Sequence, residues 1–241
     1  MSASIEERAR AIRWYHPLEL PTPSGTFVRR PEWHIRRRFA RRLRLLAIPE
    51  RLDGLSVLDC GTWDGFFAYE CERRGAVKVL AIDTYAWDTR GKDGFLLAHE
   101  ALQSKVESKR LAVEDMSTEI VGTFDLVLFL GVFYHLRSPI AVLDRLRSVC
   151  AGTLILETHV LLPATHEAYP FVSFFPGDGL ELQRPKEFTA IPTIEALTQM
   201  LLSAGFKTIE IQHRPTWRWF KKLKALVTMR PQSGRVIVHA R

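Results

Sequence analysis

The chain has 241 residues, of which 46% are hydrophobic and 25% are charged, and it carries a formal net charge of +7 at pH 7. This length and mixed composition favour one sizeable globular α/β domain with additions, and a globular enzyme is the natural expectation. A membrane span is excluded, because the longest apolar run, "FDLVLFLGVFY", is interrupted by Gly131 and is shorter than the roughly 18 residues of a spanning helix.

The cysteines and the first residues indicate a reducing compartment. Cys60, Cys71 and Cys150 are isolated in the sequence and form no CxxC pair, so we expect reduced thiols and no zinc site. The opening "MSASIEERARAIRWYHP" mixes charges and has no apolar core of a signal peptide, which favours the cytoplasm. The excess positive charge permits a phosphate-bearing partner without requiring one.

The sequence pattern divides the chain into an amino-terminal part and a main domain, which contains an insert. Residues 1–53 are expected to form a helical cap or arm, residues 54–241 the main domain, and residues at about 162–191 a Pro- and aromatic-rich insert that faces a substrate. From Leu55 onward, apolar runs alternate with helical patterns, which predicts a mostly parallel sheet with helices on both faces. Seven strands are expected, at "SVLD", "VKVLAID", "KRLAVE", "FDLVLFLG", "GTLILETHV", "TIEIQH" and "GRVIVHA", the last two as an antiparallel pair.

Two helices have clear boundaries in the sequence. In "RSPIAVLDRLRSV", Ser138 can cap the helix and Pro139 can occupy its first turn. The other helix begins at Pro192 or Thr193, and Gly205 is placed to end it in a left-handed conformation.

The stretch "VLDCGTWDGFFAYE" carries the strongest indication of a ligand. A glycine-bearing turn after a first strand lets the backbone approach a nucleotide-like ligand at the carboxyl end of a parallel sheet. Bulky Trp63 and acidic Asp64 disfavour a pyrophosphate, whereas a ligand with a positive amino-acid group fits better. The next strand ends in Asp83, at about the 20-residue distance where a carboxylate can accept both hydroxyls of a ribose.

The pattern D-x-G-x-W-x-G resembles motif I of class I S-adenosylmethionine-dependent methyltransferases, with Trp63 in place of the middle glycine. The resemblance implies a Rossmann-like fold, with a mostly parallel sheet of seven strands and helices on both faces. It implies that Asp115, or else Glu114, binds the adenine amino group and that Met116 lies against the ring. The full set of residues expected to bind S-adenosylmethionine is Asp59, Gly61, Thr62, Trp63, Gly65, Asp83, Thr84, Asp115, Met116, Leu130 and Gly131.

A narrower resemblance rests on "GVFYHLRSP", "LETHV" and "PGDGLELQRPKEFTAIPT". These segments resemble the tRNA wobble-uridine methyltransferases and their carboxymethyl-transferring relatives, which implies a hydroxylated uridine in tRNA as acceptor. In the carboxymethyl-transferring members a lysine, a tyrosine and a late arginine hold the carboxylate of the cofactor. Tyr134 matches the tyrosine, no lysine occurs in "PTPSGTFVRRPEW", and Arg214 or Arg218 matches the arginine only loosely, so we expect ordinary methyl transfer to oxygen.

The residues expected to act on the acceptor each have a structural alternative. His135 is the candidate base, because imidazole titrates near neutral pH, but it could equally tie its loop together. Tyr134 is expected to orient the acceptor or to pack under Pro139, and Arg137 to bind an anionic acceptor or to be solvated. Glu157 is expected in the site wall beside His159, and we reject metal as the default because the pair has no third ligand at a recognisable spacing.

The amino-terminal aromatic residues and the basic end have open interpretations. Tyr15 and His16 could cover the cofactor, stack on an acceptor, or belong to an arm packed on the core. The segment "TWRWFKKLKAL" suits RNA, an oligomer contact or a membrane surface. Two other functions remain open: a methyltransferase for a small-molecule or sugar hydroxyl, and a non-catalytic module that binds the cofactor or RNA. The oligomeric state is left open.

Overall fold

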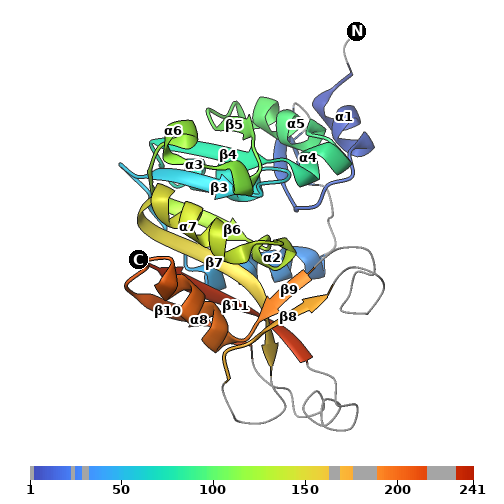
Figure 1. Cartoon of the computed structure of the whole chain (residues 1–241). Helices are drawn as coiled ribbons and strands as arrows, with labels where there is room; N and C mark the ends of the chain where they lie inside the picture. Colours follow the sequence, from blue (N-terminus) through green and yellow to red (C-terminus); the bar gives the residue numbers. More distant parts are fainter. Residues whose placement is uncertain (1–2, 23–24, 29–32, 163–168, 176–188, 216–231) are drawn as a thin grey trace. The chain divides into compact units, whose positions relative to one another are not determined.

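The computed structural model describes residues 3–22, 25–28, 33–162, 169–175, 189–215 and 232–241 (Figure 1). The chain forms two compact units. The first is Met1–Met116 with Phe124–Leu128, and the second is Ser117–Thr123 with Phe129–Arg241.

The first unit contains most of the parallel part of the sheet. Its strands and helices are, in chain order, α1 (Ile5–Ala11), β1 (Glu19–Thr22), β2 (Gly25–Val28), α2 (Trp33–Leu46), β3 (Ser56–Cys60), α3 (Phe66–Arg73), β4 (Lys78–Asp83), α4 (Tyr85–Arg90), α5 (Asp93–Leu102), β5 (Glu107–Arg110) and the 3₁₀ helix η1 (Val113–Asp115). β1 and β2 form an antiparallel hairpin, and β3 pairs in parallel with β4, which pairs in parallel with β5. α3 packs on β3 and β4, while α1 and β1 pack on α5.

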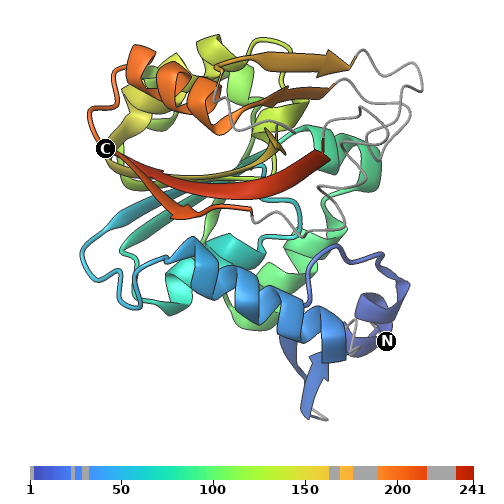
Figure 2. The same cartoon turned by 90° about the horizontal axis from the view of Figure 1, so that it is seen from below.

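The second unit contains the antiparallel part of the sheet and a separate hairpin. Its elements are α6 (Thr118–Val121), η2 (Phe133–His135), α7 (Pro139–Val149), β7 (Cys150–Leu162), β8 (Val172–Phe175), β9 (Thr189–Pro192), α8 (Ile194–Ser203), β10 (Ile209–His213) and β11 (Gln232–Ala240). β11 runs antiparallel to both β7 and β10, as Figure 2 shows. β8 and β9 form an antiparallel hairpin, and β9 packs against β7 and η2.

The central sheet has seven strands in the order β10-β11-β7-β6-β3-β4-β5, where β6 is Phe124–Leu130. The predicted sheet and the predicted pairing of the last two strands are therefore confirmed. Five consecutive residues of β6, from Leu126 to Leu130, are buried. Such a continuous apolar run is typical of a strand that is covered on both faces.

The third predicted strand is present, but its predicted boundaries are wrong. It was expected over "KRLAVE", whereas β5 is Glu107–Arg110 and all four of its residues are exposed. β5 is the edge strand and pairs only with β4, so polar residues suffice there. The chain then turns into η1, in which Val113 is buried.

The predicted helix boundaries are confirmed, with one error about a cap. α7 begins at Pro139, but Ser138 makes no side-chain capping bond, and its ψ of 66° departs from the extended conformation of a capping residue. Thr193 does have that conformation, and its hydroxyl oxygen accepts from the Ala196 N–H over 3.2 Å. Gly205 adopts a φ of 95° after α8, as predicted.

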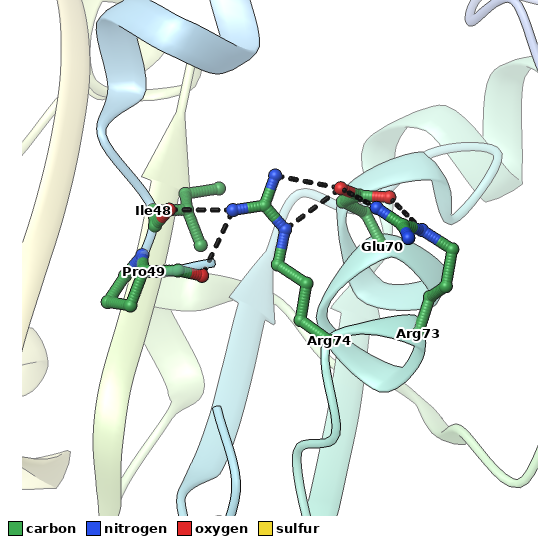
Figure 3. A network of polar contacts seen from close by, with 5 residues as sticks. All are labelled: Ile48, Pro49, Glu70, Arg73 and Arg74. Atoms are coloured by element: carbon green, nitrogen blue, oxygen red, sulfur yellow. Dashed lines mark hydrogen bonds and ion pairs between the residues drawn. The ribbon is translucent and has the colours of Figure 1, made fainter. Parts of the chain in front are cut away.

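A polar network joins α3 to the segment that follows α2 (Figure 3). Arg74 Nη1 donates to the carbonyl oxygens of Ile48 and Pro49 over 2.6 and 3.0 Å. Glu70 accepts from the guanidinium groups of Arg74 and Arg73. Because two main-chain carbonyls and one carboxylate meet a single guanidinium, the network fixes where α2 ends relative to α3.

Candidate functional site

The turn between β3 and α3 is held against the neighbouring strand by its own backbone. The N–H groups of Gly61 and Thr62 both donate to the Ile82 carbonyl, over 2.8 and 3.2 Å. Gly61 and Gly65 have φ values of 78° and 84°, a conformation that side chains rarely adopt. A Cβ on Gly65 would lie 2.5 Å from the Tyr69 ring, so glycine is required there for space as well.

Trp63 occupies the position where the methyltransferase motif has its middle glycine. Its φ is 52°, which is in the left-handed region. The backbone at this position therefore has the conformation that a glycine would supply, and the departure from the motif lies in the side chain. Trp87 Nε1 donates to the Trp63 carbonyl over 2.9 Å, which helps to hold this conformation.

Two buried carboxyl groups, those of Asp59 and Asp83, lie in the last residues of β3 and β4. Asp59 accepts from the Thr62 hydroxyl over 2.7 Å, and burial, with a further contribution from Asp83, raises the pKa of Asp59 to about 7. Asp83 accepts from the N–H groups of Trp63 and Ala86, over 2.9 Å each. Burial also raises the pKa of Asp83, although these hydrogen bonds oppose the effect.

The other expected cofactor residues lie at the following strand ends. Thr84 precedes α4 directly after Asp83. Asp115 and Glu114 are both exposed in η1, whereas Met116 is fully buried. In the second unit, Leu130 is buried at the end of β6, and the Gly131 N–H donates to the Glu157 carbonyl over 2.9 Å.

Asp64, which was expected only to disfavour a pyrophosphate, contacts the amino-terminal segment around Tyr15 and His16. Asp64 Oδ2 accepts from the main-chain N–H groups of Tyr15 and His16, over 2.6 and 3.0 Å. The Tyr15 ring stacks on Trp63 with 4.1 Å between centroids, and His16 is buried. Tyr15 and His16 thus pack on the turn that follows β3. An acidic residue inside a glycine turn was the only signal in the sequence.

A second cluster lies in the second unit, around η2. The ring of Tyr134 is 4.1 Å from that of His135 and 4.8 Å edge-on from that of His159, between centroids. Burial, together with the positive charge of Arg235, lowers the pKa of His159 to about 4, so its imidazole is neutral at physiological pH. Arg137, two residues beyond His135, is exposed.

Arg235 is a residue of this cluster that the sequence analysis missed. Its Nη1 lies 3.0 Å from Oε2 of Glu157, whose side chain is buried. In the pairing of β11 with β7, Arg235 lies opposite His159. Arg214, the arginine that was expected here, lies exposed beyond β10, and Arg218 is outside the described residues. The antiparallel pairing of "GRVIVHA" with "LILETHV" was the signal that could have identified Arg235.

The described residues offer neither a metal-binding cluster nor a membrane-spanning helix. Within that part of the chain, no three or more His, Cys, Asp and Glu side chains are arranged to hold a metal ion. No described helix has both the length and the apolar character that crossing a membrane requires.

The fold is that of a class I methyltransferase, because structures solved with SAH and of S-adenosylmethionine-dependent methyltransferases superpose on most of the chain. The N-terminal domain of EvdMO1, solved in the presence of S-adenosylhomocysteine (SAH) and D-fucose, has a TM-score of 0.67 at 20% identity. That match covers 98% of this chain and 95% of the other. A methyltransferase from Mesorhizobium loti has a TM-score of 0.54 at 17% identity and covers 83% of this chain and 96% of its own.

The methyltransferase domain family matches residues 33–211, which is most of the chain. The chain therefore belongs to the methyltransferase domain family. The tRNA U34 carboxymethyltransferase of Dichelobacter nodosus is 30% identical over 198 residues, or 72% of this chain and 56% of that protein. The protein of the same name from Pseudoalteromonas translucida is 30% identical over 174 residues, or 70% of this chain and 50% of its own. The chain thus spans about half the length of these curated relatives.

Proposed function

We propose that this methyltransferase-family chain transfers a methyl group from S-adenosylmethionine to an oxygen atom. The observation that carries the proposal is the pair of buried carboxyl groups, Asp59 and Asp83, at the ends of two adjacent parallel strands. A glycine turn with left-handed backbone lies between β3 and α3 beside them. This is where an open α/β sheet binds its ligands.

The residues of the first unit fit the cofactor in charge as well as in position. S-adenosylmethionine carries positive sulfonium and ammonium groups, and a buried carboxylate is stabilised by a nearby positive charge. Burial raises the pKa of Asp59 to about 7, and a positive group of the ligand beside it would favour its ionised form. Asp83 is assigned to the ribose hydroxyls, and Asp115 and Met116 to the adenine.

When bound, the cofactor supplies an activated methyl group. That methyl group would be transferred in line to an acceptor oxygen, with the cofactor sulfur as the leaving group that keeps the bonding electrons. A hydroxyl acceptor must also lose its proton, which we assign to an imidazole nitrogen of His135. Tyr134, whose ring lies against both His135 and His159, is assigned to orient the acceptor.

The first candidate acceptor is a hydroxylated wobble uridine of tRNA. The names of the curated relatives support it, as does the net charge of +7, which favours a polyanionic partner. Methyl rather than carboxymethyl transfer is proposed, because the amino-terminal segment lacks the expected lysine. With this acceptor the protein would act in the cytoplasm. Arg137, exposed beside His135, is assigned to a phosphate of the RNA.

The second candidate acceptor is a sugar hydroxyl. The structure that covers 98% of this chain was solved with D-fucose present, whereas the tRNA-modifying relatives are matched over about half their length. A neutral sugar would need no basic surface, so salt dependence separates the two acceptors.

The proposal is tested by calorimetric titration of the protein with SAH, followed by methyl-transfer assays. Tritium from labelled S-adenosylmethionine should enter either tRNA lacking the wobble methyl group or a panel of free, uncharged sugars. Transfer to tRNA that falls as salt rises supports the first acceptor, and salt-independent transfer to a sugar supports the second. Binding of SAH with no transfer to any acceptor supports a non-catalytic module. An absence of SAH binding contradicts the proposed cofactor.

A further inference from the structure

A single carboxylate joins the amino-terminal segment to the turn between β3 and α3. Asp64 Oδ2 accepts from the N–H groups of both Tyr15 and His16, and His16 Nδ1 lies 3.8 Å from the same oxygen. The Asp64 side chain is only 6% exposed. A Cβ on Gly94 would lie 3.0 Å from Asp64 Oδ1, so α5 packs closely on the other side of the carboxylate.

The contact places the Tyr15 ring directly on the turn. The Tyr15 and Trp63 rings are stacked at 4.1 Å with 10° between their planes. The Trp63 N–H donates to Asp83, the residue assigned to the ribose. Tyr15 is therefore stacked on a residue whose main-chain N–H binds the carboxylate assigned to the ribose.

The rest of the amino-terminal segment is fixed by apolar packing. The His16 ring lies 5.6 to 5.7 Å from the rings of Phe39, Phe66 and Phe67, between centroids. Trp14 is buried, and its Nε1 donates to the Ala9 carbonyl over 2.9 Å. Tyr15 lies between Trp14 and His16 and is only half-buried. Its ring is positioned by stacking on Trp63 and by the hydrogen bond from its backbone to Asp64.

We propose that Asp64 is a positioning residue for cofactor binding, because it holds Tyr15 against Trp63 so that the two stacked rings form one wall of the S-adenosylmethionine site. The inference rests on the proposed function and adds to it a role for the amino-terminal segment. Asp64 acts through Tyr15. The Asp64 carboxylate accepts from the N–H groups of Tyr15 and His16, and in this proposal the ligand contacts the stacked rings of Tyr15 and Trp63.

The alternative is that Asp64 serves fold stability alone. Both roles predict that Asp64→Asn lowers the melting temperature, because hydrogen bonds to a charged acceptor are the stronger ones. Only the positioning role predicts that Asp64→Asn also loses cofactor affinity. It further predicts the same loss in Tyr15→Ala, which keeps the Asp64 carboxylate. Tyr15→Phe keeps the ring and should retain the affinity.

The test is calorimetric titration of these three variants with SAH, alongside the wild type. Asp64→Asn and Tyr15→Ala should each bind about tenfold more weakly, which corresponds to about 1.4 kcal/mol at 25 °C. Tyr15→Phe should bind within about twofold of the wild type, a difference of less than 0.5 kcal/mol on the same scale. Glu100→Gln is the matched control, since Glu100 is a surface carboxylate that holds Arg8 of α1 on α5 through two hydrogen bonds.

Hydrogen exchange gives a second readout that does not depend on activity. In the wild type, SAH should slow exchange at the amides of Tyr15 and His16, and in Tyr15→Ala this protection should fall. Wild-type affinity in Tyr15→Ala, or a lower melting temperature in Asp64→Asn with unchanged affinity, would overturn the inference. If the wild type itself does not bind SAH, the proposed function fails first, and that outcome differs from the other two.

Discussion

Arg235 Nη1 lies 3.0 Å from Glu157 Oε2, so an ion pair joins β11 to β7 beside the Tyr134 ring cluster. The two side chains differ in exposure: Glu157 is 3% exposed and Arg235 is 34% exposed. Removal of the guanidinium leaves a charge in the interior, whereas removal of the carboxylate leaves a charge that water can reach. The two halves of the pair are therefore not equivalent energetically.

This asymmetry predicts unequal losses of stability. Arg235→Gln should lower the free energy of unfolding by about 2–3 kcal/mol, because the Glu157 carboxylate loses a partner that compensates its burial. Glu157→Gln should lower it by about 1 kcal/mol, the net value of an ordinary hydrogen bond. Urea unfolding of both variants at pH 7 measures the difference. Equal losses would mean that water reaches Glu157.

The network of Figure 3 predicts a similar contrast between two arginines at the end of α3. Arg74 is 13% exposed and bonds to two main-chain carbonyls, whereas Arg73 is 71% exposed. Arg74→Gln should cost about 1–2 kcal/mol, and Arg73→Gln should change stability by less than about 0.5 kcal/mol, as is usual for surface pairs. Urea unfolding provides the measurement. A cost for Arg73→Gln as large as that for Arg74→Gln would contradict the prediction.

Glu70 of the same network should confer a pH dependence. Burial opposes ionisation, but the hydrogen bonds from Arg73 and Arg74 prevail and lower the pKa of Glu70 below the ordinary value of 4.5. A lowered pKa means that the stabilisation is present above pH 4.5 and is lost as pH falls through the folded-state value. Glu70→Gln should therefore unfold with a smaller loss of stability between pH 5 and pH 3 than the wild type. Parallel pH profiles of the two proteins would contradict the assignment.

The fold could be predicted from the sequence because its signals are local. Apolar runs, Pro139 at a helix start and Gly205 at a helix end each report on a few neighbouring residues, and the structure confirms them. The edge strand β5 was misplaced because its residues are exposed and carry no apolar pattern. Ser138 was misjudged because capping depends on backbone torsions that its residue type does not fix.

The candidate site was only partly accessible to sequence reasoning. The turn from Asp59 to Gly65 could be found, since its glycines and acids follow one strand. The contact of Asp64 with Tyr15 spans 49 positions, and that of Arg235 with Glu157 spans 78. Contacts at such separations depend on strand pairing and on the path of the amino-terminal segment, which a single sequence does not specify. The roles of the expected site residues remain predictions.

His135 gives the sharpest prediction about catalysis. Replacement by Ala should lower turnover by about 100-fold or more while SAH affinity is kept, because general-base catalysis contributes to the chemical step. His213→Ala, at the end of β10 in the same unit, is the control and should keep full turnover. Turnover by His135→Ala at the wild-type rate would exclude the base and leave His135 as a residue that holds η2.

Asp59 links the proposed cofactor site to stability. Its pKa is raised from 3.8 to about 7, so the folded protein binds the proton more tightly than the unfolded chain. A raised pKa gives stability that is fully present below pH 3.8 and is lost as pH rises through about 7. Without ligand, the wild type should therefore lose roughly 2–4 kcal/mol between pH 5 and pH 8, and Asp59→Asn should lose less.

Asp59→Asn should also bind the cofactor more weakly than the wild type. At pH 8 an ionised Asp59 would attract the ammonium group of SAH, and a neutral Asn would not, so Asp59→Asn should bind SAH about tenfold more weakly. Melting temperatures at pH 5 and pH 8, with and without SAH, measure both effects in one experiment. Asp59→Asn should be the more stable protein at pH 8 without SAH and should gain less from its addition. If the wild type and the variant gain equally, Asp59 is a buried structural acid, and the cationic part of the ligand lies elsewhere.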